Sequence, residues 1–600
     1  MTSHDVVDAT TQDGSHPRPQ LLRNHWHDLS GEWGYARDDA RTARVHDVIF
    51  DRRIVVPFPP ESPASGIHET GFTPCVWYRR TFGPDELTAA GLTPERSRVL
   101  LHFGAVDHSA AVWVNGSLVA THHGGQSPFD ADITDAIDPA AENVLIVRAV
   151  DDPDDVSALR GKQDWRERPH SIWYHRTTGI WQPVWLECVP ESSVEAVSWR
   201  TDLPAASIEA EVELAGRVDP GSWVRVAVRH AGELLAEVRV RTGGRRHCPV
   251  RLVIPRQLNG QAYEELLWSP AHPTLLSTSV TLETSDGAVV DAVGSYLGLR
   301  SVAVSSDHLL LNDRPIPVRA VLAQNYWPET HLAATAGMLR REVELILELG
   351  FNTARVHQKA EDPRFLYWAD RLGLMVWAET ANAYAFDERA IAGLVGEWMA
   401  LVRRDRSHPS VVVWVPLNES WGVQHISHDQ RQSALSRSAS DLTRALDGTR
   451  PVISNDGWEH TASDIWTIHD YEPSPDVLAA RYGDPKALSD MLAGFGPAGR
   501  RMSVGRPETD GPVILSEFGG VSLETEGSDD WGYSSASDPA AFEAQVTSIL
   551  AAVRDAGPLA GFCYTQLTDT GQETNGLLYA DRSPKFPAER IRAAVTGEAG

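Results

Sequence analysis

Residues 411–421 read VVVWVPLNESW, a run of β-branched and aromatic side chains that ends in the polar pair Asn418 and Glu419. Such a run is typical of a strand buried on both faces, as in a parallel sheet. The polar pair would lie at the carboxyl end of that strand, where β/α barrels carry their chemistry. Residues 512–520, PVILSEFGG, place Glu517 in the same position. One such glutamate is usually a loop residue or an ion-pair partner, but two in this context favour catalysis.

From about residue 317 to the end, strand patterns alternate with helical ones. Helical periodicity is clearest over residues 336–349 and 387–404, and residues 472–511 form a long insertion rich in Pro, Gly and Arg. We expect eight strands, at residues 318–322, 353–356, 374–377, 411–415, 451–454, 465–468, 513–515 and 561–564. Eight strands alternating with helices predict a (β/α)8 TIM barrel over residues 303–600. Glu419 would follow its fourth strand and Glu517 its seventh.

The first half of the chain shows short strands and turns. Residues 1–20 are polar and contain Pro and Gly, so we expect a mobile tail. Over residues 21–190 a β-sandwich is expected, in which Asn115 and Gly116 join two alternating strands as a tight hairpin. Residues 191–302 predict an immunoglobulin-like sandwich. A hairpin at residues 309–316 leads into the barrel.

The composition excludes some classes of binding partner and favours others. The 600 residues carry a formal net charge of −28, which argues against nucleic acid and anionic membranes as partners. The polar N-terminus lacks a secretory signal, and no apolar stretch reaches membrane-spanning length, so we expect a cytoplasmic protein. Four scattered cysteines are typical of buried free thiols. The 20 tryptophans favour a carbohydrate ligand, since indole faces stack on sugar rings.

Two carboxylates at one barrel rim suit glycoside hydrolysis with retention, which requires carboxyl groups about 5–5.5 Å apart. One stays ionised and attacks the anomeric carbon, while the other protonates the leaving oxygen and then activates water. We assign Glu517 as the nucleophile and Glu419 as the acid/base. Asn418 would bond the sugar 2-hydroxyl.

Other polar residues follow the expected strands and are candidate substrate-binding residues. For each of them, ordinary barrel packing or an ion pair is the competing interpretation. Tyr471 would also hydrogen-bond the nucleophile and hold it ionised. We expect no metal site and no other cofactor, because no His, Cys or acidic cluster has ligand spacing. The candidate substrate-binding residues at the strand ends are Arg355, His357, Glu379, His469, Asp470, Tyr471, Gln566 and Asp569.

Several motifs together resemble family 2 glycoside hydrolases, which include β-galactosidases, β-glucuronidases and β-mannosidases. They are FGAVD at residues 103–107, VWVNG at 112–116, GIW at 179–181, the Asn418-Glu419 pair and SEFG at 516–519. The resemblance implies a multidomain fold: an N-terminal jelly-roll-like β-sandwich, an immunoglobulin-like β-sandwich and a C-terminal TIM barrel. It also implies a retaining, exo-acting mechanism with catalytic glutamates on strands four and seven.

This sequence departs from the family pattern at positions that help to decide which sugar is bound. Many relatives carry an Asp six residues before the Gly-Ile of residues 179–180; Trp173 stands there, and Asp164 in a longer loop could substitute. Trp173 is therefore a further candidate substrate-binding residue. Glucuronidases hold the sugar carboxylate with Asn-x-Lys, where this chain has Glu573, Thr574 and Asn575. A buried carboxylate without a cation is costly, so we discount a glucuronidase.

The first choice is thus a β-galactosidase acting on a terminal neutral hexose. β-Mannosidase, β-glucosidase-like and β-glucuronidase activities are alternatives. From another class, a catalytically inactive carbohydrate-binding protein is also an alternative. The partner would be a carbohydrate or glycoside, and assembly as a homo-oligomer is left open.

Overall fold

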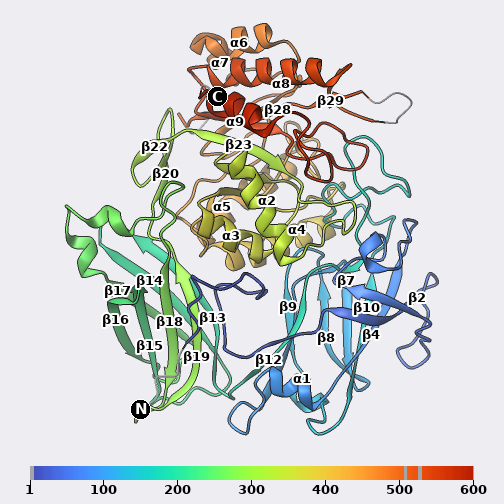
Figure 1. Cartoon of the computed structure of the whole chain (residues 1–600), viewed down its shortest axis with the longest axis vertical. Coiled ribbons are helices and arrows are strands. Elements are labelled where there is room, and N and C mark those ends of the chain that lie inside the picture. Colours follow the sequence, from blue (N-terminus) through green and yellow to red (C-terminus); the bar gives the residue numbers. More distant parts are fainter. Residues whose placement is uncertain (1–5, 506–509, 525–529, 599–600) are drawn as a thin grey trace.

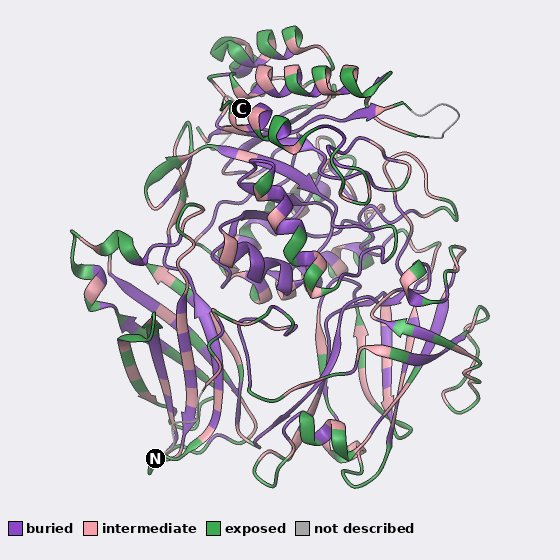
Figure 2. Ribbon diagram, in the orientation of Figure 1, coloured by how far each residue is buried: buried purple, intermediate pink, exposed green. Residues whose placement is uncertain are grey.

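The computed structural model describes residues 6–505, 510–524 and 530–598. A barrel forms the upper half of the molecule in Figure 1, with two β-sandwiches below it. Buried residues fill the centre of the barrel and the inner faces of both sandwiches (Figure 2).

The first sandwich consists of a six-stranded and a four-stranded antiparallel sheet. Alternate residues of its strands point into the core, as in Asn143–Val150, because side chains alternate across a strand. At the predicted hairpin Asn115 and Gly116 take φ of +48° and +81°, the left-handed values that a tight turn requires. The strands, in sheet order, are β3 Arg52–Val56, β2 Gly31–Arg37, β4 Cys75–Phe82, β10 Asn143–Val150, β7 Ser109–Val114 and β8 Ser117–His123, and then β1 His27–Asp28, β12 Val184–Val189, β5 Arg98–Phe103 and β9 Phe129–Asp132. A short ribbon, β6 Val106–Asp107 with β11 Gly179–Ile180, and helix α1 Pro84–Ala89 complete this part.

The second sandwich has three strands facing four, as the immunoglobulin-like prediction requires. Its strands are β13 Ser193–Asp202, β14 Ser207–Ala215 and β17 His247–Val253, and then β16 Glu233–Arg241, β15 Trp223–His230, β18 Leu276–Glu283 and β19 Val289–Leu297. A small sheet of β20 Val302–Val304, β21 Leu309–Leu311 and β22 Arg314–Ile316 leads into the barrel and contains the predicted hairpin.

Seven parallel strands form the barrel sheet, in the order β26-β25-β24-β23-β31-β28-β27. Seven of the eight predicted strands are therefore confirmed. The residues at which these strands end lie close to the predicted ones. The strands are β23 Val318–Ala323, β24 Thr353–Val356, β25 Met375–Glu379, β26 Val411–Val415, β27 Trp466–Asp470, β28 Val513–Gly519 and β31 Gly561–Thr565. The helices are α2 Ala336–Glu348, α3 Pro363–Leu372, α4 Glu388–Asp405, α5 Gln430–Leu446, α8 Pro539–Arg554 and α9 Ala588–Thr596.

The predicted fifth strand, residues 451–454, does not form a ladder and makes a single parallel bridge, Trp414 to Val452. On its other side the Asp464 side chain accepts the Val452 backbone N–H at 2.8 Å, and Pro451 has no N–H to donate. A side chain thus replaces the neighbouring strand at this point, which the sequence pattern could not indicate.

The insertion before the seventh strand is not simply a loop. Its described part carries two short helices, α6 Pro475–Gly483 and α7 Pro485–Leu492, and α6 packs against α8. Residues 506–509 of the insertion lie outside the described residues. A short parallel ribbon, β29 Val521–Leu523 with β30 Ser534–Ala536, follows β28.

The N-terminal segment differs from the expected mobile tail. Residues 1–5 lie outside the described residues, but residues 6–20 pack against the rest of the chain rather than forming a mobile tail. Ala9 is fully buried, and the Gln20 amide donates to the carbonyls of Tyr296 at 3.2 Å and Ser407 at 3.1 Å. The segment therefore ties the second sandwich to the barrel through long-range contacts that composition does not reveal.

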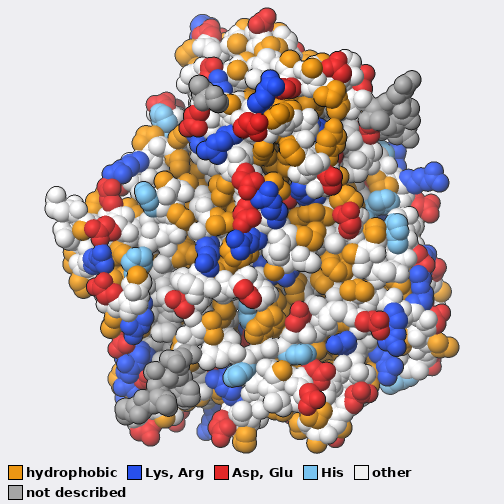
Figure 3. Space-filling model, in the orientation of Figure 1, with side chains coloured by type: hydrophobic (Ala, Val, Ile, Leu, Met, Phe, Trp, Pro, Cys, Tyr) orange, Lys and Arg blue, Asp and Glu red, His pale blue; other side chains and the backbone are white. Residues whose placement is uncertain are grey.

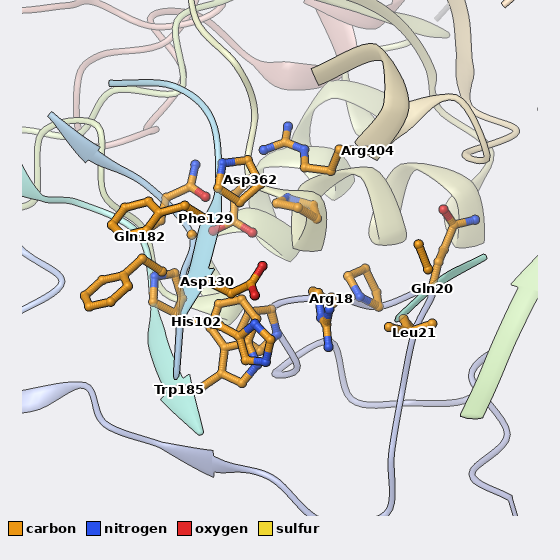
Figure 4. A pocket seen from close by; sticks show the side chains of 18 of the residues that line it. Arg18, Gln20, Leu21, His102, Phe129, Asp130, Gln182, Trp185, Asp362 and Arg404 are labelled. Atoms are coloured by element: carbon orange, nitrogen blue, oxygen red, sulfur yellow. The ribbon is translucent and has the colours of Figure 1, made fainter. Parts of the chain in front are cut away.

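A cavity of about 230 Å³ lies where the segment meets all three domains. Figure 4 shows Arg18 and Gln20 of the segment, Trp185 of the first sandwich and Asp362 of the barrel around it. Neither Glu419 nor Glu517 lines this cavity. It is therefore a feature of the domain junction, separate from the residues singled out above.

Three further observations concern the whole chain. Acidic and basic side chains are interspersed on the face shown in Figure 3. All four cysteines are buried and free, as predicted. Within the part of the chain that the structure describes, no helix has both the length and the apolar character needed to cross a membrane.

Candidate active site

Arg355, on strand β24, lies at the centre of the carboxyl end of the barrel and is completely buried. Its Nε donates to Glu379 Oε1 at 2.5 Å and its Nη1 to Glu517 Oε1 at 2.7 Å, while its Nη2 lies 2.8 Å from Asp456 Oδ2. Three buried carboxylates thus surround one guanidinium. Since unpaired buried charge is costly, a second cation beside these carboxylates lowers the cost of burying them.

His469, in strand β27, supplies that second positive charge. Its Nδ1 lies 2.7 Å from Glu419 Oε1 and 3.5 Å from Glu517 Oε2, and its Nε2 lies 3.4 Å from Asp456 Oδ2. Burial alone would lower the pKa of His469, but the charge of Glu517 and the hydrogen bonds to Asp456 and Glu419 raise that pKa to about 10. The ring is therefore an imidazolium at neutral pH.

Glu517 lies within β28 and is held as a carboxylate. Burial would raise the pKa of Glu517, but the charges of His469 and Arg355 lower it. The Tyr471 hydroxyl donates to Glu517 Oε2, as the sequence predicted. Burial and the charge of Glu517 raise the pKa of Tyr471 well above its ordinary value, so this phenol remains a donor.

Glu419 follows β26 in an unusual backbone conformation. Glu419 and Ser420 have φ of +51° and +58°, in the left-handed region that residues other than glycine rarely adopt. The Glu419 N–H donates to the Asp456 carbonyl at 3.0 Å, and the Ser420 N–H donates to Asn455 Oδ1 at 2.8 Å. These bonds hold a turn that costs about 1–3 kcal/mol per strained residue and directs the Glu419 side chain toward the barrel centre.

Glu419 and Glu517 approach one another closely. A carboxylate oxygen of each, together with a ring nitrogen of His469, all lie within 4.8 Å of one another. The Glu517 side chain is 5% exposed and that of Glu419 is 20% exposed. By residue type these three side chains could also hold a metal ion, for which His469 would have to be neutral.

An aromatic pocket of about 470 Å³ opens beside Glu419. Trp173 and Trp165 reach it from the loop between β10 and β11 of the first sandwich, and the Trp173 ring stacks against Trp421 at 6.1 Å. Two domains therefore build one pocket wall. The lining residues are Val156, Trp165, Trp173, Tyr384, Glu419, Ser420, Trp421, Gln424 and Trp458.

Asn418 and His357 complete the group around Arg355. Arg355 Nη2 donates to Asn418 Oδ1 at 2.7 Å and lies 3.2 Å from His357 Nδ1. Burial and the adjacent Arg355 charge lower the pKa of His357 well below its ordinary value, so its ring is neutral. Of the sequence-predicted residues, the structure brings together Arg355, His357, Glu379, Asn418, Glu419, His469, Tyr471 and Glu517, with Trp173 on the pocket wall.

Three predicted residues stand apart from this cluster. Asp470 Oδ2 accepts from Tyr482 at 2.7 Å and pairs with Arg481, so it anchors helix α6. Asp569 pairs with Lys585 at 2.7 Å. Gln566 belongs to a neighbouring amide network. Asp164, the suggested substitute for the missing Asp, instead accepts from the His170 ring at 2.7 Å within its own loop.

Asp456 is a central residue that sequence reasoning missed. It contacts Arg355 and His469, and Ser516 Oγ donates to Asp456 Oδ1 at 2.8 Å. It follows the predicted fifth strand by two residues, so the rule that identified Glu419 could have identified it. The pocket residues Trp165 and Tyr384 carried no comparable signal, because they come from loops.

His469→Asn is expected to move the acid limb of the kcat/KM pH profile to higher pH. Loss of the imidazolium raises the pKa of Glu517, so protonation of that carboxylate begins at a higher pH. The measurement is the pH profile of both enzymes on one chromogenic substrate, with the exposed His428→Asn as control. An unchanged acid limb would show that His469 does not control the ionisation of Glu517.

Two family models match this chain. The "sugar binding domain" of "Glycosyl hydrolases family 2" matches residues 54–190, and the "TIM barrel domain" of the same family matches residues 302–529. The chain is 26% identical over 469 residues to "Beta-galactosidase 2" of Enterobacter cloacae, covering 74% of this chain and 41% of that protein. It is 25% identical over 453 residues to "Beta-galactosidase" of Thermoanaerobacter pseudethanolicus, covering 73% of this chain and 57% of that one. The chain thus spans about half the length of these curated relatives.

Solved structures share the whole fold at low identity. A Bifidobacterium dentium β-glucuronidase, complexed with coumarin-3-O-glucuronide, has a TM-score of 0.76 and 20% identity, with 97% of this chain and 98% of that chain covered. An Eisenbergiella tayi β-galacturonidase, bound to galacturonate, has a TM-score of 0.73 and 19% identity with the same coverage. These likenesses show that the fold is shared over almost the whole of this chain. Together the two family models match more than half of the residues, and the chain belongs to family 2 of the glycosyl hydrolases.

Proposed function

We propose that this chain is an exo-acting retaining β-glycosidase that removes a terminal neutral β-linked hexose by double displacement. The observation that carries this proposal is the approach of Glu419 and Glu517: one carboxylate oxygen of each lies within 4.8 Å of the other, at the carboxyl end of the barrel. Retaining enzymes hold their two carboxyl groups about 5–5.5 Å apart, whereas inverting enzymes leave about 6.5–9.5 Å for a water molecule.

The surroundings of the two glutamates support different roles. Glu517 is the deeper residue and is kept ionised by Arg355 and His469, as a nucleophile must be. Its carboxylate attacks the anomeric carbon and forms a glycosyl ester. Glu419 lines the aromatic pocket, where the departing group would stack on indole rings. It protonates the leaving oxygen and then removes a proton from the attacking water.

Neighbouring residues suit recognition of sugar hydroxyls. Arg355 engages the carbonyl oxygen of the Asn418 amide, so its NH₂ group is the end that would donate to the 2-hydroxyl. Such a bond strengthens in the transition state. The neutral ring of His357 can serve a second hydroxyl as donor or acceptor, depending on its tautomer.

β-Galactoside is the first choice of substrate. The names of the curated relatives favour it, whereas the names of the structural neighbours, glucuronidase and galacturonidase, favour uronides. The stretch Glu573 to Asn575 lacks the Lys that glucuronidases use, which favours a neutral sugar. β-Mannoside and β-glucoside remain alternatives within the class. The inactive binding protein is disfavoured because Glu419 and Glu517 are both present and lie in one cluster with Arg355 and His469.

An aryl β-galactoside, or failing that another neutral β-hexoside, is expected to be cleaved with far higher kcat/KM than the matching glucuronide. A uronate carboxylate buried without a free cation costs several kcal/mol, on the order of a thousandfold or more. Direct competition between the two substrates at equal concentration measures this ratio. Comparable or faster glucuronide turnover would contradict the neutral-sugar assignment.

A further inference from the structure

A lysine that the sequence could not place lies next to Glu573. Lys162 comes from the first sandwich, in the loop between β10 and β11, and its Nζ is 2.7 Å from Glu573 Oε2 in the barrel. The two side chains are 4% and 2% exposed, about as buried as that of Glu517. The pair thus joins two domains by a buried charge contact across 411 positions of sequence.

This pair lies at the end of a chain of contacts that begins at Glu517. Tyr471 donates to Glu517 and approaches Thr565 Oγ1 at 3.5 Å. The next residue, Gln566, donates to Asn575 Oδ1 at 2.7 Å, and Asn575 Nδ2 lies 3.4 Å from Glu573 Oε1. Polar side chains of strand β31 and the loop after it thus lead from Glu517 toward Glu573, with one step along the backbone from Thr565 to Gln566.

Both charges also act on residues near the two glutamates. The charge of Lys162 contributes to the lowered pKa of His357, after burial and the Arg355 charge. Burial and the charges of Glu419, Glu517 and Glu573 all raise the pKa of Tyr533. Lys162 and Glu573 thus act on residues that flank the two catalytic candidates, although they reach the site from different domains.

The chemistry of the pair differs from that of a lone cation. A free buried ammonium would attract the carboxylate of a uronic sugar. Here Glu573 already neutralises Lys162, so a second carboxylate would meet a like charge and an ammonium that is already paired. Neutral hydroxyls avoid that repulsion, because the ammonium donates and the carboxylate accepts hydrogen bonds.

We propose that the Lys162–Glu573 pair determines the sugar class: Glu573 neutralises Lys162 and so excludes uronides in favour of neutral sugars. This inference rests on the proposed function, since it concerns the sugar that would be bound at Glu419 and Glu517. Replacing Glu573 by an uncharged isostere would expose a cation to the sugar. The enzyme would then shift toward uronides without any change to Glu419 or Glu517.

The test compares kcat/KM for matched aryl β-galactoside and β-galacturonide in the wild type, Glu573→Gln, Lys162→Met and the double variant. Glu573→Gln is expected to raise the uronide-to-neutral ratio at least tenfold, and the double variant should lose that gain. Inhibition by free galacturonate and galactose gives a second readout that does not need turnover. Galacturonate should bind Glu573→Gln at least tenfold better relative to galactose.

Glu361→Gln is the matched control, because Glu361 Oε1 lies 3.5 Å from Lys359 Nζ in a second buried pair. It should leave both ratios unchanged, and Tm reports whether each variant is folded. If Glu573→Gln does not fold, Glu573→Asn replaces it. Unchanged ratios in a folded Glu573 variant, with the wild type still preferring the neutral hexoside, would overturn this inference alone. A wild type that prefers the uronide would overturn the proposed neutral-sugar function itself.

Discussion

Glu517→Gly is expected to lower kcat/KM on an aryl β-hexoside by roughly four to six orders of magnitude, as is usual for loss of a nucleophile. The change removes the attacking carboxylate but leaves Arg355 and Glu419 in place. Added azide can then enter the vacated space and attack from the same face, so the product should be an α-glycosyl azide. Product identification by NMR checks this outcome.

The control is Glu344→Gln, on helix α2, whose carboxylate pairs with Arg340 at 2.7 Å. It should retain wild-type kcat/KM. If Glu517→Gly kept near-normal activity, the nucleophile would have to be another residue. Formation of the β azide by that variant would mean that Glu517 is the acid/base instead.

Glu419→Ala should show a different pattern, set by the leaving group. General acid catalysis contributes roughly 10²–10⁴-fold, and that contribution matters most when the leaving oxygen is basic. Turnover of an alkyl glycoside should therefore fall by about that factor, whereas a dinitrophenyl glycoside should form the glycosyl ester at nearly the normal rate. Azide should restore turnover of the activated substrate and give a β-glycosyl azide, because it attacks the ester from the face that water uses.

The same substrates in the Glu344→Gln control should show no dependence on the leaving group beyond that of the wild type. An equal loss on both substrates would show that Glu419 does not act as the acid. An α azide from Glu419→Ala would reverse the two assignments.

Much of the fold is visible in the sequence because local pattern and tertiary environment agree there. The run Val411–Val415 is apolar on both faces and forms a barrel strand that is buried along its whole length. The Asn115-Gly116 turn is fixed by its own backbone preferences. Where long-range contacts decide the outcome, the pattern misleads: Asp464 takes the place of a strand beside Val452, and Gln20 fixes a segment whose composition suggests a mobile tail.

The same distinction separates the site residues that the sequence predicts from those that it could not predict. Glu419 and Glu517 could be predicted because each ends an apolar run in a parallel strand, so the barrel must bring them to one rim. The sequence identifies His469 only as a polar residue at the end of a predicted strand. Its positive charge depends on three carboxylates that come from separate segments of the chain. Lys162 and Trp165 could not be predicted at all, because only folding carries their loop from the first sandwich into the barrel.

The anomeric configuration of the first sugar released tests the central claim most directly. An activated aryl β-hexoside is hydrolysed in D₂O and followed by ¹H NMR from the first seconds, before mutarotation mixes the anomers. With Glu419 and Glu517 acting across the short separation seen here, the β anomer should appear first and the α anomer only later. Initial release of the α anomer would mean direct attack by water, and it would contradict the two-step mechanism and the role of Glu517 as a nucleophile.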